Sequence, residues 1–172
     1  MRGKMGNKSF WIKFFASGCF ISYMPAKITG FKKFTGSGMA GTLLAMFLYW
    51  LFPECFAANK YIFGLFVLVL FPLCVWVSGR AEEIFNKPDD PRIVVDEILG
   101  YWTAVLFVPY SWPELIAAFV LFRALDTLKP WPISFFERKV QGGFGVMMDD
   151  IVGGAEAGIL ALLLSKFVFP LF

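Results

Sequence analysis

Acidic side chains at the edges of apolar segments are the residues of this sequence best suited to chemistry. Asp149 and Asp150 are adjacent in GGFGVMMDDIVGG, residues 142–154, and an apolar segment follows them to the end of the chain. An acid at a membrane boundary needs a basic side chain, a metal ion or water as a partner, and such an acid is by default a candidate functional residue. The alternative is a pair of solvated acids at a helix start, stabilised by the helix dipole.

The composition is that of an integral membrane protein. The 172 residues are 58% hydrophobic and 19% aromatic, with a mean hydropathy of +0.67, which is too apolar for an ordinary soluble domain. This length suits a single membrane-embedded domain over residues 1–172. The net charge is +3, and its Lys and Arg residues cluster in a few segments, which favours contact with anionic lipid and argues against nucleic acid as a partner.

The sequence contains no histidine, which excludes Ser-His-Asp triads, HExxH metal sites and haem ligation by His. Cys19, Cys55 and Cys74 lack CxxC spacing, so we expect reduced structural thiols. Cys74 and Arg80 match the C-x5-R spacing of cysteine-dependent phosphatases, but the residues between them are apolar where a phosphate loop needs glycine-rich backbone. Carboxylates and basic side chains are therefore the expected chemical groups.

Five apolar segments predict an all-α, polytopic membrane helical bundle. They cover residues 35–52, 61–78, 93–110, 114–128 and 149–172, separated by polar loops that include residues 80–92 and 129–145. The segment 61–78 is the clearest span, because a helix of this length covers about 27 Å. The apolar run 10–24 follows a basic head and predicts an interfacial or re-entrant helix, without a typical signal-peptide cleavage site.

The positions of Lys and Arg predict the topology. The N-terminal region and the loops 80–92 and 129–139 hold nearly all of them, whereas the connections 53–60 and 110–113 hold one between them. The positive-inside rule then places the three basic regions in the cytoplasm. We expect a multi-pass protein of the bacterial cytoplasmic (inner) membrane, with six charged residues at the cytoplasmic ends of three helices: Asp96, Glu97, Arg123, Asp126, Asp149 and Asp150.

Antiparallel packing would bring the acids of these helix ends together. Five acids at one membrane depth repel one another unless a divalent cation lies between them, and an oxygen-only set favours Mg²⁺; the candidates are Asp96, Glu97, Asp126, Asp149 and Asp150. Adjacent helix residues point about 100° apart, so one acid of each adjacent pair can bind metal while the other orients water or pairs with a base. Arg123 and Lys129 offer cations for a phosphoryl group, although a local ion pair between Arg123 and Asp126 is the simpler reading of their spacing.

Three blocks of the sequence resemble the phosphatidylglycerophosphatase A family. They are VVDEILGYW at 94–102, FRALDTLKPWPISFFERKVQGGFGVMMDDIVGG at 122–154 and, less closely, residues 17–45. The resemblance implies a magnesium-dependent hydrolase that converts phosphatidylglycerophosphate, a phospholipid with an anionic head group, into phosphatidylglycerol and inorganic phosphate. It implies catalytic and metal-binding roles for the five acids and phosphate binding by Arg123 and Lys129.

The first of these blocks along the chain departs from the family pattern. TGSGMAGT, residues 35–42, stands where the family has a compact glycine turn and a helix start. By that position Thr35, Gly36 and Ser37 are candidates for binding phosphate through backbone N–H groups. Close packing of membrane helices explains the glycines equally well.

Several alternatives stay open at this point. Magnesium and a carboxylate can direct water at phosphorus, or an aspartate can form a covalent phosphoenzyme; the absence of a DxDx[TV] signature favours water. A phospholipid head-group transferase is a rival function, but its DG-x2-AR-x8-G-x3-D-x3-D motif is absent. A small ion-coupled transporter is another, although it would place its acids near the bilayer midplane.

Overall fold

The computed structural model describes residues 2–29, 36–53 and 58–167, and every regular element in these ranges is helical. This confirms the predicted all-α class. The elements in chain order are α1 (Arg2–Ala16), η1 (Ile21–Tyr23), α2 (Met24–Thr29), α3 (Ser37–Leu51), α5 (Lys60–Phe85), α6 (Val95–Val105), α7 (Trp112–Leu128), α8 (Ile133–Lys139) and α9 (Gly142–Phe167).

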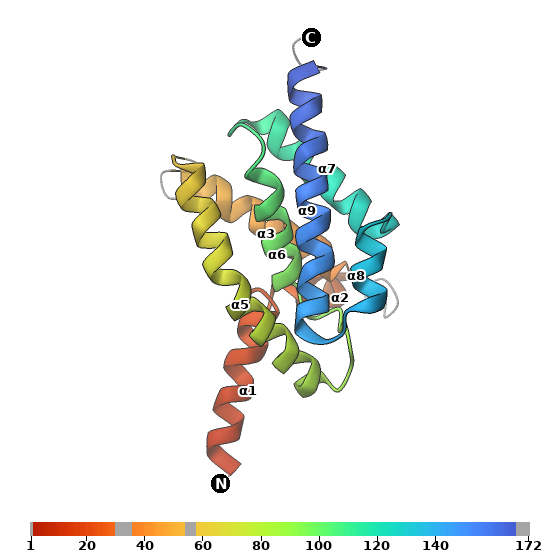
Figure 1. Ribbon diagram of the computed structural model, residues 1–172. Coiled ribbons are helices and arrows are strands. Elements are labelled where there is room, and N and C mark those ends of the chain that lie inside the picture. The colour runs from red at the N-terminus through yellow and green to blue at the C-terminus, as the bar shows by residue number, and fades with distance from the viewer. Residues whose placement is uncertain (1, 30–35, 54–57, 168–172) are drawn as a thin grey trace.

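Helix α9 is the central element of the bundle, and it packs against α5, α6, α7 and α8 (Figure 1). Its contact with α6 depends on Gly154, because a Cβ there would collide with the carbonyl oxygen of Gly100. Small residues let two helices approach closely enough for backbone contact. The close approach sets the first turns of α6 beside the Asp150 turn of α9.

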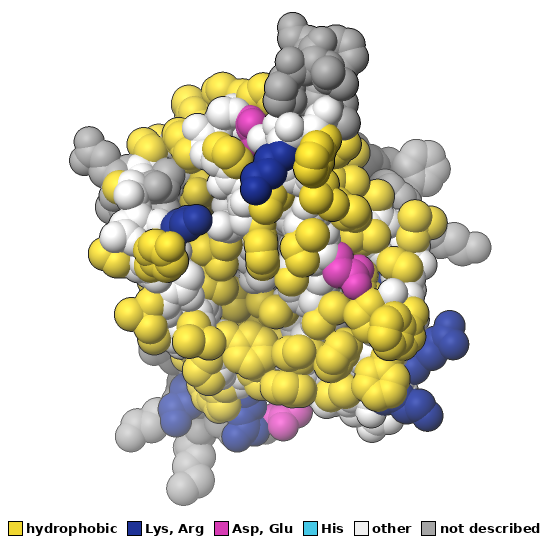
Figure 2. Space-filling view, turned by 45° about the horizontal axis from the view of Figure 1, so that its top comes forward, with side chains coloured by type: hydrophobic (Ala, Val, Ile, Leu, Met, Phe, Trp, Pro, Cys, Tyr) yellow, Lys and Arg dark blue, Asp and Glu magenta, His cyan; other side chains and the backbone are white. Residues whose placement is uncertain are grey.

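The outer surface of the bundle is strongly apolar. Large side chains of α5 are exposed, including Tyr61, Leu68 and Val69, while Phe63 and Val67 on its other face are buried in the core. Hydrophobic side chains cover most of the face seen in Figure 2, and several Lys and Arg side chains lie along its lower edge. An exposed apolar area of this extent marks a surface that meets lipid or another protein.

Helix α5 has the length and hydropathy of a membrane span. Its best window has a mean hydropathy of 2.4, and within the described ranges it is the one helix that is both long enough and apolar enough to cross a bilayer. Helix α3 is apolar but shorter. Helix α6 has 11 residues and a length of about 16 Å, less than the hydrocarbon thickness of a bilayer.

Three boundaries differ from the sequence prediction. The expected loop 80–92 is helical as far as Phe85, and the expected loop 129–145 contains α8 and the start of α9. Asp149 and Asp150 therefore lie about two turns inside α9, not at the start of a helix. The early start occurs because Gly143 packs directly against the backbone of Val75 in α5, so tertiary contact outweighs the low helix propensity of glycine.

The apolar run 10–24 is also not one helix. Helix α1 ends at Ala16, and the three residues Gly18, Cys19 and Phe20 all have positive φ before η1 begins. Positive φ is outside the helical region for L-residues, so the chain turns sharply there. Helix α1 projects from one end of the bundle (Figure 1).

Candidate active site

The start of α6 is held in place by the loop before it. Asp90 accepts hydrogen bonds from Arg92 Nε at 2.7 Å and Nη2 at 2.8 Å. Burial raises the pKa of Asp90, but the hydrogen bonds and charge of Arg92 outweigh it and hold the pKa below its usual value. Ser22 Oγ donates to the Arg92 carbonyl at 3.0 Å, and the Val94 N–H donates to the Ala16 carbonyl at 2.8 Å. The N-terminal segment and this loop thus fix the first turn of α6.

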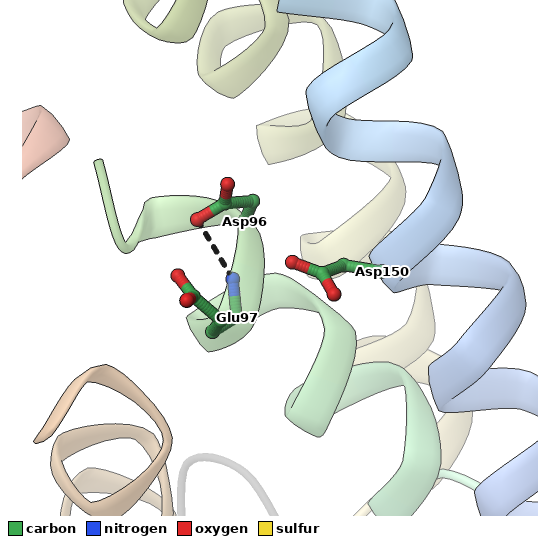
Figure 3. A group of neighbouring side chains, drawn as sticks. All are labelled: Asp96, Glu97 and Asp150. Carbon is green, nitrogen blue, oxygen red and sulfur yellow. Dashed lines mark hydrogen bonds between the residues drawn. The ribbon is translucent and has the colours of Figure 1, made fainter. Parts of the chain in front are cut away.

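Three carboxylates meet where α6 faces α9. Asp96 and Glu97 come from the first turn of α6, and Asp150 points toward them from α9 (Figure 3). One oxygen of each carboxylate lies within 4.8 Å of the other two. Asp96 and Asp150 are buried, and Asp96 Oδ1 accepts a hydrogen bond from the Glu97 N–H at 3.0 Å. We call Asp96, Glu97 and Asp150 the acidic trio.

The acidic trio fits a hard divalent cation. Its donors are all carboxylate oxygens, the ligand type that Mg²⁺ prefers. Glu97 Oε2 is buried, and no hydrogen-bond partner for it exists among the residues that the structure describes. A buried carboxylate oxygen without a partner is costly, and repulsion within the trio adds to that cost. A cation between the three groups would relieve both.

Arg123 of α7 lies beside the trio with one side of its guanidinium engaged. Nη1 contacts Asp126 Oδ2 at 3.0 Å and donates to Thr42 Oγ1 at 3.3 Å. Nε is buried and lacks a hydrogen-bond partner in the described part of the chain. Nε and Nη2 form the edge with which arginine binds two oxygens of a phosphate. Gly38 in α3 leaves the space for this arrangement, since a Cβ there would collide with Glu97 Oε1 and lie 3.1 Å from Arg123 Nη2.

Lys129 supplies the second cation. It follows the last residue of α7 in a left-handed conformation, with φ of 43°, and its Nζ lies 3.0 Å from Asp149 Oδ2. Asp149 Oδ1 accepts the Asp150 N–H at 3.1 Å. The five predicted acids therefore separate into the trio and two acids, Asp126 and Asp149, that each pair with a basic side chain.

One cavity of about 390 Å³ is lined by the five acids, Arg123 and Lys129. Among the predicted residues, Gly36 and Ser37 at the start of α3 line it, whereas Thr35 lies outside the described residues. The sequence reasoning missed Gly38, Thr42 and Asp89; the small residues of TGSGMAGT were the available signal for the first two. The cavity is lined by Gly36, Ser37, Gly38, Met39, Asp89, Pro91, Ile93, Asp96, Glu97, Arg123, Asp126, Thr127, Lys129, Val146, Asp149 and Asp150.

The C-x5-R spacing at Cys74 does not form a phosphate loop. Cys74 is buried in the core and lies, like Arg80, inside the continuous helix α5. Backbone N–H groups inside a helix bond to carbonyls of the preceding turn and cannot cradle a phosphate. Arg80 contacts Glu83 at 2.7 Å on the surface. Cys74 and Cys19 are free thiols, as predicted, and Cys55 lies outside the described residues.

A helical bundle with an apolar exterior and a cavity that holds clustered carboxylates beside an arginine and a lysine has the chemical groups that a phosphatase acting on lipid needs. Comparison with known proteins gives the family. The model of the phosphatidylglycerophosphatase A family matches residues 14–165, and the chain belongs to that family.

Three curated proteins that are similar to this chain carry two different names. Phosphatidylglycerophosphatase A of Escherichia coli is 41% identical over 98 residues, which are 55% of this chain and 57% of that protein. The Haemophilus influenzae protein of the same name is 33% identical over 135 residues, which are 78% of this chain and 79% of that protein. A Bacteroides thetaiotaomicron protein, provisionally named as a phosphatidylinositol-3-phosphatase, is 36% identical over 81% of this chain and 92% of its own. No solved structure matched the chain.

Proposed function

We propose that this protein hydrolyses phosphatidylglycerophosphate to phosphatidylglycerol and inorganic phosphate with the help of Mg²⁺. The observation that carries the proposal is the meeting of the acidic trio, Arg123 and Lys129 at one cavity. The family and the names of two relatives support the reaction and the substrate. The name of the third relative favours a different lipid phosphomonoester as the alternative substrate.

Arg123 is the proposed phosphate anchor. Its Nη1 is held by Asp126 and Thr42, which leaves Nε and Nη2 as the donors that we propose for the phosphoryl group. Two parallel N–H···O bonds to a phosphoryl group give both charge neutralisation and orientation. Lys129, kept in position by Asp149, adds a second positive charge at the same cavity.

The acidic trio is the proposed magnesium site. Asp96, Glu97 and Asp150 would hold the ion, which when bound polarises the phosphoryl group and lowers the pKa of bound water. Asp126 and Asp149 are not needed as ligands in this scheme, because each holds a basic side chain in position. Water forms the new bond to phosphorus and gives up a proton, while the P–O bond to the glycerol oxygen of the head group breaks and that oxygen takes up a proton. Positioning supplies most of the acceleration.

We further propose that α3, α5, α6, α7 and α9 are the five membrane spans, with the cavity on the cytoplasmic side of the bacterial inner membrane. The positive-inside distribution supports the orientation, and the exposed apolar side chains of α3, α5, α7 and α9 support contact with lipid. Helix α6 is short, but it packs against α3, α5, α7 and α9. An element covered by protein does not have to match the thickness of the hydrocarbon layer.

The test is phosphate release by the purified protein in mixed micelles. Phosphatidylglycerophosphate, phosphatidylinositol 3-phosphate and a soluble phosphomonoester should be compared at equal concentration, with EDTA and with Mg²⁺ restored. We expect the highest kcat/KM with phosphatidylglycerophosphate and loss of activity in EDTA. A higher kcat/KM with phosphatidylinositol 3-phosphate would make that lipid the substrate in place of phosphatidylglycerophosphate. Undiminished turnover in EDTA would show that the reaction needs no metal ion.

A further inference from the structure

We propose that Thr42 is a positioning residue for the reaction, and that its hydroxyl fixes the orientation of the Arg123 guanidinium. This inference rests on the proposed phosphate-binding role of Arg123. Thr42 comes from α3 and is fully buried. The first turn of α3 lines the cavity, and Thr42 is the residue through which α3 contacts the Arg123 guanidinium.

The polarity of the Thr42 hydroxyl follows from its two contacts. Thr42 Oγ1 donates its single hydrogen to the Gly38 carbonyl, one turn earlier in α3, at 2.9 Å. With that hydrogen used, the oxygen presents only lone pairs to Arg123 Nη1, which lies 3.3 Å away. The hydroxyl is therefore locked as an acceptor toward the guanidinium.

This acceptor determines which donors of Arg123 reach the substrate. Nη1 carries two hydrogens, and its two acceptors among the residues with a described position are Asp126 Oδ2 and Thr42 Oγ1. Asp126 lies on the same helix as Arg123, so its contact does not tie the guanidinium to another helix. Thr42 belongs to a different helix, and its contact ties the guanidinium to the frame of the cavity. With Nη1 held in this way, Nη2 lies beside Gly38 and the Glu97 carboxylate.

Gly38 also helps to hold the Arg123 guanidinium in place. The Gly38 carbonyl accepts from Thr42, and the missing side chain gives room for the guanidinium, since a Cβ would lie 3.2 Å from Nη1 and 3.1 Å from Nη2. Gly38 and Thr42 thus place one turn of α3 against the flat group of Arg123. A valine at 42 would keep the shape of threonine and lose both the donor to the Gly38 carbonyl and the acceptor for Arg123.

The experiment compares Thr42→Val with Thr42→Ser and a matched control. Thr103 makes the same type of bond in α6, from Oγ1 to the Leu99 carbonyl at 2.9 Å, and no hydrogen bond from Arg123 to it occurs among the described residues. We expect Thr42→Val to lower kcat/KM about tenfold, as for loss of a hydrogen bond to a charged group. It should also raise the inhibition constant of inorganic phosphate. Thr42→Ser should recover most of kcat/KM, and Thr103→Val should match the wild type.

The double variant separates positioning from a general structural effect. In an Arg123→Ala background, adding Thr42→Val should change kcat/KM little, because the group that Thr42 orients is gone. Three results would overturn the inference. Thr42→Val could lower kcat/KM as much in the Arg123→Ala background as in the wild type, it could leave the kcat/KM of the wild type unchanged, or Thr42→Ser could be as impaired as Thr42→Val. Wild-type activity in Arg123→Ala itself would instead overturn the proposed role of Arg123. The two failures are thereby distinguished.

Discussion

Lys129 Nζ lies 3.0 Å from Asp149 Oδ2, and this ion pair connects the end of α7 to α9 across the candidate active site. The two side chains are 23% and 11% exposed, so water screens the pair incompletely. A partly buried charge that loses its partner is strongly disfavoured. The pair therefore has both a structural and a chemical role in our scheme.

Replacing Lys129 by Met should expose both roles. We expect a loss of kcat/KM of about tenfold or more, because a phosphate-binding charge is removed. The free energy of unfolding should fall by about 1–2 kcal/mol, discounted for partial solvent screening. Thermal unfolding in detergent and steady-state kinetics measure the two effects.

The double variant Lys129→Met with Asp149→Asn provides the check on stability. It should be less destabilised than the sum of the two single variants, because it leaves no unpaired charge. Additive losses would show that the two residues act independently. Arg80→Met is the control, since its pair with Glu83 is exposed on both sides and should contribute little.

The acidic trio and the two paired acids should respond differently to Mg²⁺. Asp150→Asn removes a proposed ligand, so we expect the Mg²⁺ concentration for half-maximal activity to rise about tenfold or more. Asp126→Asn should lower activity through Arg123 and leave that concentration nearly unchanged. Thermal unfolding gives a reading independent of turnover, because a bound ion stabilises the folded state by mass action. If Mg²⁺ raises the unfolding temperature of Asp150→Asn as much as that of the wild type, Asp150 is not a ligand of the ion.

Local spacing predicted part of the site correctly. Arg123 and Asp126 stand three residues apart on one helix, and they form the expected ion pair at 3.0 Å. The 100° rotation between neighbours predicted that the two acids of an adjacent pair need not share an ion. Asp149 contacts Lys129 while Asp150 belongs to the trio, but Asp96 and Glu97, which are also adjacent, both belong to it. These relationships depend on the geometry of a single helix, which the sequence encodes directly.

Contacts between helices could be predicted only coarsely from the sequence. Antiparallel packing predicted that the acids of these helix ends meet, but not that Asp96, Glu97 and Asp150 alone form the trio, since that selection depends on the close approach of α6 and α9 at Gly154. The sequence likewise gave no reason to pair Thr42 with Arg123, because they are 81 positions apart and meet only after α3 packs beside α7. The boundary of α9 was wrong for the same reason, as the packing of Gly143 on α5 extends the helix through glycines.

Gly38 offers a direct test of the geometry around Arg123 and Glu97. In Gly38→Ala the new Cβ would collide with Glu97 Oε1, so we expect at least a tenfold loss of kcat/KM, consistent with the sensitivity of catalysis to small displacements. Gly64→Ala in α5 is the matched control, because its Cβ would come no nearer than 3.7 Å to another side chain. That control should keep full activity and gain stability from the higher helix propensity of alanine. Equal activity of the two variants would count against the close packing at Gly38.

Cys74→Ser tests the remaining alternative to carboxylate and metal chemistry. Cys74 is buried in the hydrophobic core and lies within α5 with its backbone in a regular helix, so it lacks both access to a phosphate and the loop that would bind one. We expect activity within about twofold of the wild type, and a modest loss of thermal stability because a hydroxyl replaces a thiol in an apolar environment. Treatment of the folded protein with N-ethylmaleimide should likewise leave phosphate release intact. An inactive Cys74→Ser variant with normal thermal unfolding, together with an active Asp150→Asn variant, would require a thiol mechanism in place of the one proposed.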